Sequence, residues 1–211
     1  AQIFPKGADI VGAHAATMVF SYLVLMAMGL IEWRVKGTAG RPLGGLIQVG
    51  ALFLGGAMLV VTFLFVTDPN VAQGVAGLDG LLQVVAVVLF AVRVVPAAVR
   101  TDWMAAGAGR FFAASSLFVL VAIALFIYLI SLFISAAGDV SKVPAGVLVA
   151  NDHSVFIGVT TNLLLGVAFA LTADRPAPNA AGASLGFFGM NLGLVVFLVG
   201  LISSTEMLST Q

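Results

Sequence analysis

The chain has 211 residues, of which 61% are hydrophobic and only 9% are charged, and its mean hydropathy is +1.17. Soluble domains carry about a quarter charged residues, so this composition excludes a soluble fold. The net charge of zero provides no basic face for nucleic acid. The absence of cysteine excludes disulfides, thiolate-bound iron–sulfur clusters and covalently attached c-type haem.

Six apolar runs predict an all-α membrane protein with a single six-helix transmembrane domain over residues 1–211. Each run is long enough to cross a bilayer core, which takes about 20 residues. Breaker sequences such as Asp68-Pro69-Asn70 separate the runs. The first run is too long for the apolar part of a cleaved secretory signal, so we expect none. The expected spans are 10–33, 43–66, 78–99, 111–136, 148–173 and 185–205.

The cations are distributed unevenly over the two sides of the predicted bundle. Seven of the nine fall on the first, third and fifth loops or their flanks, and only Lys6 and Lys142 fall on the other side. Because cationic loops stay in the cytoplasm, we expect both termini to be extracytoplasmic. The membrane that we expect is a prokaryotic plasma membrane. The seven cations are Arg34, Lys36, Arg41, Arg93, Arg100, Arg110 and Arg175.

The only two histidines, His14 and His153, each open an apolar span. Both spans are odd-numbered, so their helices are expected to run in the same direction. His14 lies 20 residues before Arg34, and His153 lies 21 residues before Asp174, which is about 30 Å of helix in each case. The two imidazoles are therefore predicted at nearly the same depth, close to the outer face.

Two imidazoles at one depth indicate a shared ligand, although the sequence does not show whether their helices touch. Our main hypothesis is one b-type haem with both histidines as axial ligands, since such a haem needs no cysteine. Lys6 and Lys142 are then the expected partners of its propionates, while Asp9 and Asp152 are expected to accept an imidazole N–H. A closed zinc site needs four ligands, so a copper site of His and Asp is the weaker alternative. An interfacial histidine that only forms a hydrogen bond is the simplest alternative for either residue alone.

Two patterns of mostly apolar residues occupy the last two predicted spans. They are His153-x-Val155-Phe156-x-Gly158-Val159-x-x-Asn162-Leu163-x-x-Gly166 and Phe187-Phe188-Gly189-Met190-Asn191-Leu192-Gly193-Leu194. Together they resemble a helix pair of the catalytic subunits of haem–copper oxidases and nitric oxide reductases, and the segment from His14 to Glu32 resembles a fainter copy. That family has more spans and more ligand histidines than this chain. The resemblance therefore implies at most one bis-histidine haem and no haem–copper oxygen-reducing centre.

These observations predict an integral membrane subunit of a respiratory or photosynthetic redox complex, with haem b at His14 and His153 for electron transfer. The expected partners are other membrane subunits, membrane lipid, and quinol or an extracytoplasmic electron carrier. The alternative is a non-catalytic accessory subunit that packs against a larger complex and binds lipid or pigment. A small-molecule transporter is disfavoured because no broken helices recur in matching halves. No nucleophile–base or paired-carboxylate pattern indicates an enzyme that acts by itself.

Polar residues are rare inside the spans. Glu32 and Arg93 are expected at similar depth near the cytoplasmic side, where Arg93 either pairs with Glu32 or extends to the surface. Four amides are expected to form hydrogen bonds between helices, each contributing about 1 kcal/mol. These amides are Gln48, Gln83, Asn162 and Asn191.

Small residues four positions apart recur along the chain and let helices approach closely. On the last span they are Gly182 with Gly186, and Gly189 with Gly193. We expect these glycines at helix contacts.

Overall fold

The computed structural model describes residues 10, 13–14, 17–36, 42–136, 142–173 and 179–209. In this part of the chain, six helices are long and apolar enough to cross a membrane. The same residues contain no strand. The prediction of an all-α integral membrane protein with six spans is therefore confirmed.

Nine helical segments make up the six spans of the described chain. The first span consists of η1 (Thr17–Val24) and α2 (Leu25–Lys36), and the next three are α3 (Pro42–Phe65), α4 (Pro69–Val99) and α5 (Ala108–Ser135). The fifth span consists of α6 (Ala145–His153), η3 (Ser154–Thr161) and α7 (Asn162–Leu171), and the sixth is α8 (Ala180–Ser209). The segments η1 and η3 are π-helical, whereas the others are α-helical.

Helix α4 begins at Pro69, although the sequence predicted a start near residue 78. The Asp68 carboxylate accepts hydrogen bonds from the backbone N–H of Asn70 at 2.8 Å and of Val71 at 3.4 Å, which makes Asp68 the N-cap. Pro69 occupies the first helical turn, where its missing N–H removes no helical hydrogen bond. The sequence Asp68-Pro69-Asn70, which was expected to separate two spans, thus also starts the second of them. As a result, Asp79 lies inside a helix and not at its outer end.

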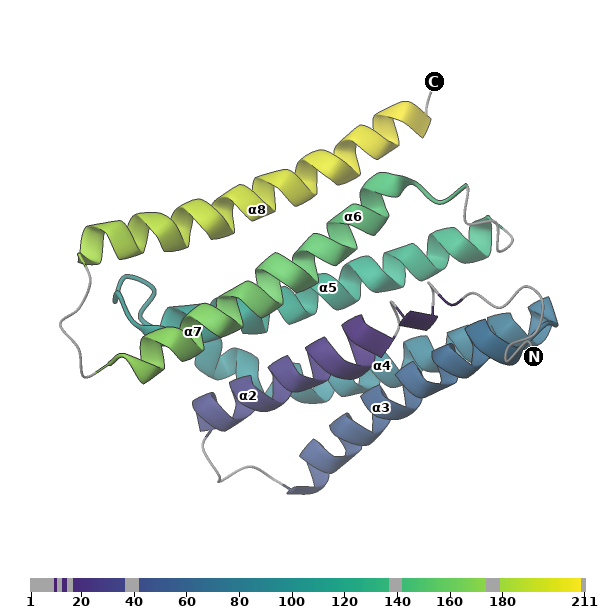
Figure 1. Cartoon of the computed structure of the whole chain (residues 1–211), viewed down its shortest axis with the longest axis horizontal. Helices are drawn as coiled ribbons and strands as arrows, with labels where there is room; N and C mark the ends of the chain where they lie inside the picture. The colour runs from purple at the N-terminus through teal and green to yellow at the C-terminus, as the bar shows by residue number, and fades with distance from the viewer. Residues whose placement is uncertain are drawn as a thin grey trace.

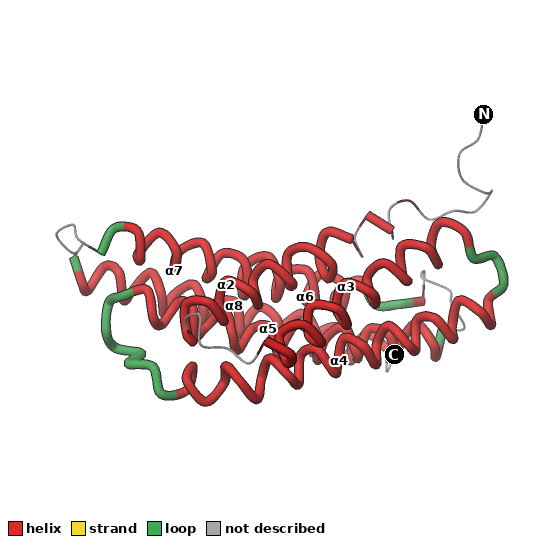
Figure 2. The backbone as a smooth tube through the Cα atoms, turned by 90° about the horizontal axis from the view of Figure 1, so that it is seen from below, coloured by secondary structure: helices red, strands yellow, loops and turns green. Residues whose placement is uncertain are grey.

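The spans alternate in direction along the bundle. The helix ends joined by the first, third and fifth loops gather at one end, and the loop between α3 and α4 lies at the other end (Figure 1). Figure 2, turned by 90°, shows the helices running along the same long axis. The described helix ends that flank the cationic loops therefore share one end of the bundle, and the cytoplasmic location of this end stays a prediction.

The order of the spans across the bundle places α8 and α3 at its edges. Helix α8 packs against α6 and η3, while η1 packs against α3 and η3, and α5 packs against the fifth span, α2 and α4. In Figure 1 the fifth span lies between α8 on one side and η1 with α2 on the other. The core between these helices contains wholly buried side chains such as Phe90, Met28 and Leu163.

Two glycines of the fifth span let it approach α5 closely. A Cβ added at Gly158 would lie 2.5 Å from the Phe118 ring, and one added at Gly166 would lie 3.2 Å from the Phe112 ring. Both phenylalanines are buried. The aromatic rings of α5 thus fill the space that the missing side chains leave.

Candidate functional site

The two histidines are each followed by a π-helical segment. Segment η1 begins three residues after His14, and η3 begins directly after His153. In η3 the Thr161 hydroxyl donates to the carbonyl of Phe156, five residues earlier, at 2.9 Å. Segments η1 and η3 contact each other. Because π-helical turns are rare and are frequently found at functional sites, this contact between the first and fifth spans marks a candidate site.

The His153 imidazole is fixed by two contacts. Its Nδ1 lies 2.8 Å from the carbonyl oxygen of Val149, and its ring centroid lies 5.1 Å from that of Phe197 on α8. A carbonyl oxygen only accepts hydrogen bonds, so Nδ1 carries a proton, and in the neutral form of the ring the lone pair is on Nε2. Nε2 is therefore the atom of His153 that is prepared to bind a metal or accept a proton.

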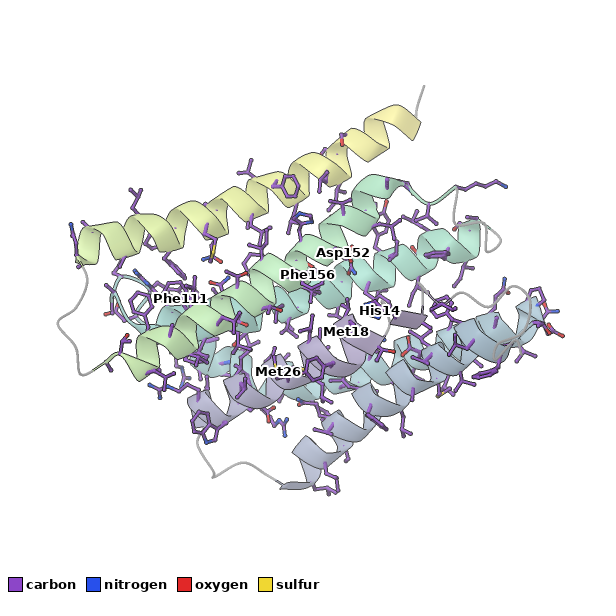
Figure 3. All side chains as sticks on the ribbon, in the orientation of Figure 1. His14, Met18, Met26, Phe111, Asp152 and Phe156 are labelled. Carbon is purple, nitrogen blue, oxygen red and sulfur yellow. The ribbon has the colours of Figure 1, made fainter. Side chains whose placement is uncertain are left out.

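His14 lies on the helical turn before η1 and is exposed, as is Met18 four residues later. Asp152 and Phe156 on the fifth span are also exposed. Figure 3 shows these four side chains along the line where the first and fifth spans run side by side. This arrangement brings His14 into the neighbourhood of Asp152 more readily than into that of the His153 ring.

The structure does not bring the two imidazoles together. The His153 ring faces Phe197 on α8, whereas η1 packs on another side of the fifth span. Among the described residues, no group of three or more His, Cys, Asp or Glu could hold a metal ion. The haem and copper hypotheses thus stay predictions without support from the side-chain arrangement.

The other residues expected around the haem are only partly within the described chain. Lys6 and Asp9 lie outside the described residues. Lys142 is exposed and precedes α6, at the end of the fifth span where His153 lies. Asp152 follows Asn151 on α6, and the hydrogen bond of His153 Nδ1 goes to Val149. The roles assigned to these four residues remain predictions.

The expected pairing of Glu32 with Arg93 is confirmed. Arg93 on α4 donates to the Glu32 carboxylate on α2 and to the side-chain oxygen of Gln48 on α3. The guanidinium passes close to Gly44, where an added Cβ would lie 3.1 Å from Nη1. Three helices are thus tied together by one cation, and Gln48 forms the interhelical hydrogen bond that the sequence predicted.

The two asparagines also form the expected contact between helices. Asn162 on α7 donates to Asn191 Oδ1 on α8 at 2.8 Å, and Asn191 donates back to Asn162 Oδ1 at 3.2 Å. Each amide also donates to a carbonyl of its own helix, at Gly158 and at Phe187. This reciprocal pair satisfies both side chains and fixes α8 against the fifth span.

The prediction that Gln83 forms a hydrogen bond between helices is wrong. Its partner is Asp79 on the same helix, a contact that the sequence did not predict. Gln83 Nε2 donates within its own helix to Asp79 Oδ1 at 2.9 Å and to Oδ2 at 3.0 Å. Both side chains are wholly buried. The predicted span began at residue 78, which placed Asp79 at the end of a helix and not inside it. The signal that identifies the pair is its spacing of four inside a helix that begins at Pro69.

Arg110 is a second functional residue that the sequence analysis missed. It is 1% exposed and donates to the Ala183 carbonyl at 2.8 Å and to the Ser184 hydroxyl at 3.0 Å, both on α8. Its guanidinium carbon lies 4.7 Å from the Phe187 ring centroid and 5.5 Å from that of Phe111. Such cation–π contacts stabilise a desolvated guanidinium. Arg110 thus fixes the start of α8 to α5.

Five glycines form a stripe along the outward side of α8, beside the exposed side chains of Leu185, Leu192 and Val196. At 100° per residue, the glycine positions cluster roughly 140° around the helix from the positions that pack inward. The glycines are exposed, and no described atom lies within 4 Å of a Cβ added at any of them. We call these residues the α8 glycine face: Gly182, Gly186, Gly189, Gly193 and Gly200. The inward positions are Phe187, Asn191, Leu194 and Leu198.

No protein family, no curated protein and no solved structure matches this chain. The resemblance to haem–copper oxidase and nitric oxide reductase subunits therefore stays a sequence-based prediction. What the chain does has to be argued from its own geometry.

Proposed function

We propose that this protein is a non-catalytic membrane subunit of a larger complex and that it binds its partner through the α8 glycine face. The observation that supports this is the position of the five glycines, which face away from the rest of the described chain. We expected such glycines at helix contacts, but a Cβ added at any of these five meets no described atom within 4 Å. The partner that fits is a transmembrane helix of a different subunit, because a small-residue face lets two helix backbones approach closely in lipid.

An energetic argument favours a partner over lipid at this face. Glycine lowers helix stability by about 1 kcal/mol per residue relative to alanine in water. Lipid chains pack against a leucine as well as against a glycine, so contact with lipid gives no reason for glycine at these positions. In membranes, a face of small residues is typical of helix interfaces, where another helix occupies the space that the missing side chains leave.

The inward face of α8 is held in a way that presents the glycine face rigidly. Arg110 fixes its first turn, the Asn162–Asn191 pair its middle, and the His153–Phe197 contact the following turns. These contacts come from α5, α7 and α6, so α8 cannot rotate about its axis without losing all of them. A fixed rotation keeps the glycines pointing outward.

Native electrophoresis of detergent-solubilised membranes tests this proposal. The wild-type chain should migrate within a larger complex, and Gly189→Leu should release it at the size of the free chain. Gly29→Leu on α2 is the matched control, because an added Cβ at exposed Gly29 also meets nothing within 4 Å in the described structure. The proposal fails if Gly189→Leu leaves the complex intact, or if the wild-type chain migrates alone or as a self-associated oligomer.

A redox role of the complex is the second candidate. It is favoured by the π-helical segments that follow both histidines, by the free Nε2 of His153, and by the resemblance described above. The partners would then be redox subunits, with quinol or an extracytoplasmic carrier as electron donor or acceptor and with lipid or pigment filling the contacts. In this candidate, His153 binds haem b or copper through Nε2 and His14 acts separately.

The absorption spectrum of the purified complex tests the redox candidate. A reduced-minus-oxidised difference spectrum should show haem or copper bands that decrease on His153→Ala. His14→Ala is the informative comparison, because the bands should remain if His14 acts separately, and equal loss in both variants would contradict that assignment. A colourless complex that contains the wild-type chain would contradict the redox candidate and leave the accessory-subunit proposal unchanged.

A further inference from the structure

Asp79 and Gln83 form a buried polar pair within the hairpin of α3 and α4. Both side chains are wholly buried, and they lie one helical turn apart on α4. Asp79 is ten residues from the start of α4, and the facing Gly55 is ten residues from the end of α3, so the pair lies roughly 15 Å from the hairpin tip. An isolated carboxylate at such a site is expensive and indicates a function by itself.

Gly55 on α3 packs directly against the carboxyl group. A Cβ added at Gly55 would lie 2.5 Å from Asp79 Oδ1, so no other residue fits at this position without movement. The next residue of α4, Gly80, faces α5, because a Cβ added there would lie 3.5 Å from Ile130. The carboxyl group is thus enclosed by helices and not by water.

The hydrogen bonds of the pair are incomplete. The single amide nitrogen of Gln83 donates to both carboxyl oxygens of Asp79, at 2.9 and 3.0 Å. The other end of the same amide, Gln83 Oε1, is buried and has no hydrogen-bond partner among the described residues. Gln83 Oε1 therefore lacks a hydrogen-bond donor among the described residues. The neighbouring Asp79 carboxyl group has one donor there, Gln83 Nε2.

The charged and titratable groups of the surrounding helices are engaged elsewhere or distant. Helix α3 contains none. On α4, Arg93 lies 14 residues from Asp79 and binds Glu32 of α2. On α5, Arg110 binds α8 at the far end of the helix, and Tyr128 packs with residues around Val143. None of these groups neutralises a negative charge on Asp79.

We propose that Asp79 and Gln83 form a proton-binding site. On protonation, the new Oδ–H of Asp79 donates to Gln83 Oε1, while Gln83 Nε2 donates to the other Asp79 oxygen. A small rotation of the Gln83 amide about its last torsion, which is a soft one, closes this ring. The acid–amide ring satisfies the unpartnered oxygen and leaves no net charge in the bundle. The proton comes from water at the hairpin end, and loss of the proton restores the single-donor arrangement.

Infrared difference spectroscopy of the purified protein tests this site. The wild-type spectrum minus that of Asp79→Asn should contain a carboxylic acid carbonyl band at neutral pH, which converts into carboxylate bands only at alkaline pH. The control is Asp68→Asn, since Asp68 is an exposed N-cap whose difference spectrum should contain carboxylate bands at neutral pH. Carboxylate bands alone in the Asp79 difference at neutral pH would overturn the proposal.

A second measurement covers the case that Asp79→Asn does not fold. Wild-type protein labelled with carbon-13 at every aspartate carboxyl should show an isotope-shifted carboxylic acid band at neutral pH, because Asp79 is the only wholly buried aspartate of the described chain. In Gln83→Leu the same band should shift in frequency, since its hydroxyl loses the amide acceptor. A labelled protein without any shifted acid band would overturn the proposal as well.

Discussion

Replacement of Gly158 by alanine should destabilise the contact between η3 and α5. The added methyl carbon would lie 2.5 Å from two atoms of the Phe118 ring and 2.9 Å from the Phe118 Cβ. Carbon atoms pack best at about 3.5–4.0 Å, so the two helices must separate by about 1 Å. Phe118 is 7% exposed and cannot rotate out of the way. Overpacking of this kind costs about 1–3 kcal/mol, of which about 1 kcal/mol is offset by the better helix propensity of alanine.

Unfolding of the purified protein in mixed micelles with increasing sodium dodecyl sulfate, followed by circular dichroism, measures this loss. Gly189→Ala on α8 is the matched control, because its methyl group meets no described atom and the free energy of unfolding should not fall. The double variant Phe118→Leu with Gly158→Ala should be more stable than the sum of the single changes predicts, because the smaller side chain leaves room for the methyl group. Equal stability of Gly158→Ala and Gly189→Ala would refute the packing described for this site.

Three further predictions follow from the polar contacts and the charge distribution. Arg93→Leu should lower the free energy of unfolding by about 1.5–3 kcal/mol in the same assay, because Glu32 and Gln48 lose a charged donor. As a control, Arg100→Leu at an exposed position should change the free energy of unfolding by less than about 0.5 kcal/mol. Equal effects of the two substitutions would contradict the pairing of Arg93 with Glu32. Asn191→Leu should cost about 1 kcal/mol and Asn162→Leu with Asn191→Leu little more, since the two amides satisfy each other; additive losses would show that the pair is not reciprocal. A reporter enzyme that is active only outside the cytoplasm should be active at the C-terminus, because the loops with seven of the nine cations share the other side; activity of a cytoplasmic reporter there would reverse the orientation.

The number and length of the spans could be predicted because lipid imposes one requirement on every crossing segment. The backbone must satisfy its own hydrogen bonds within an apolar run, and hydropathy records this directly. The pairing of Glu32 with Arg93 was predictable for a similar reason, since two ionisable groups inside a bilayer have few partners other than each other. The Asn162–Asn191 contact follows from the same scarcity of partners.

The side-chain positions near the histidines could not be predicted from periodicity. A π-helical turn contains one more residue than an α-helical turn. Each such turn changes the direction in which the following residues point, so a 3.6-residue period no longer describes the faces of the first and fifth spans. His14 and His153 were correctly expected on parallel spans, and η1 and η3 do touch. The His153 ring contacts Phe197 on α8, a direction that depends on a local helix geometry that the amino acids do not encode in any simple pattern.

Asp79 and Arg110 were missed for a different reason. Both lie close to positions where a helix was expected to end, and a charged residue at a helix end is ordinarily solvated. The Asp68 cap extends α4 beyond Asp79, and the Ala183 carbonyl of α8 reaches Arg110 from a segment far away in the sequence. The extension of α4 is encoded locally, because Asp68-Pro69 is a recognisable helix start. The contact of Arg110 with α8 depends on tertiary packing and could not be predicted from the local sequence.

Helix α8 has buried polar contacts on its inner side and a row of glycines on its outer side. An edge helix that met only lipid on its outer side would need neither a buried arginine, nor a reciprocal amide pair, nor a row of glycines. Arg110 and Asn191 set its rotation, and that rotation places all five glycines on the outer side. Polar contacts in a membrane specify geometry at a modest gain in stability, of order 1 kcal/mol each. A fixed rotation of this kind supports the proposal above that the α8 glycine face meets a closely packed helix of another subunit.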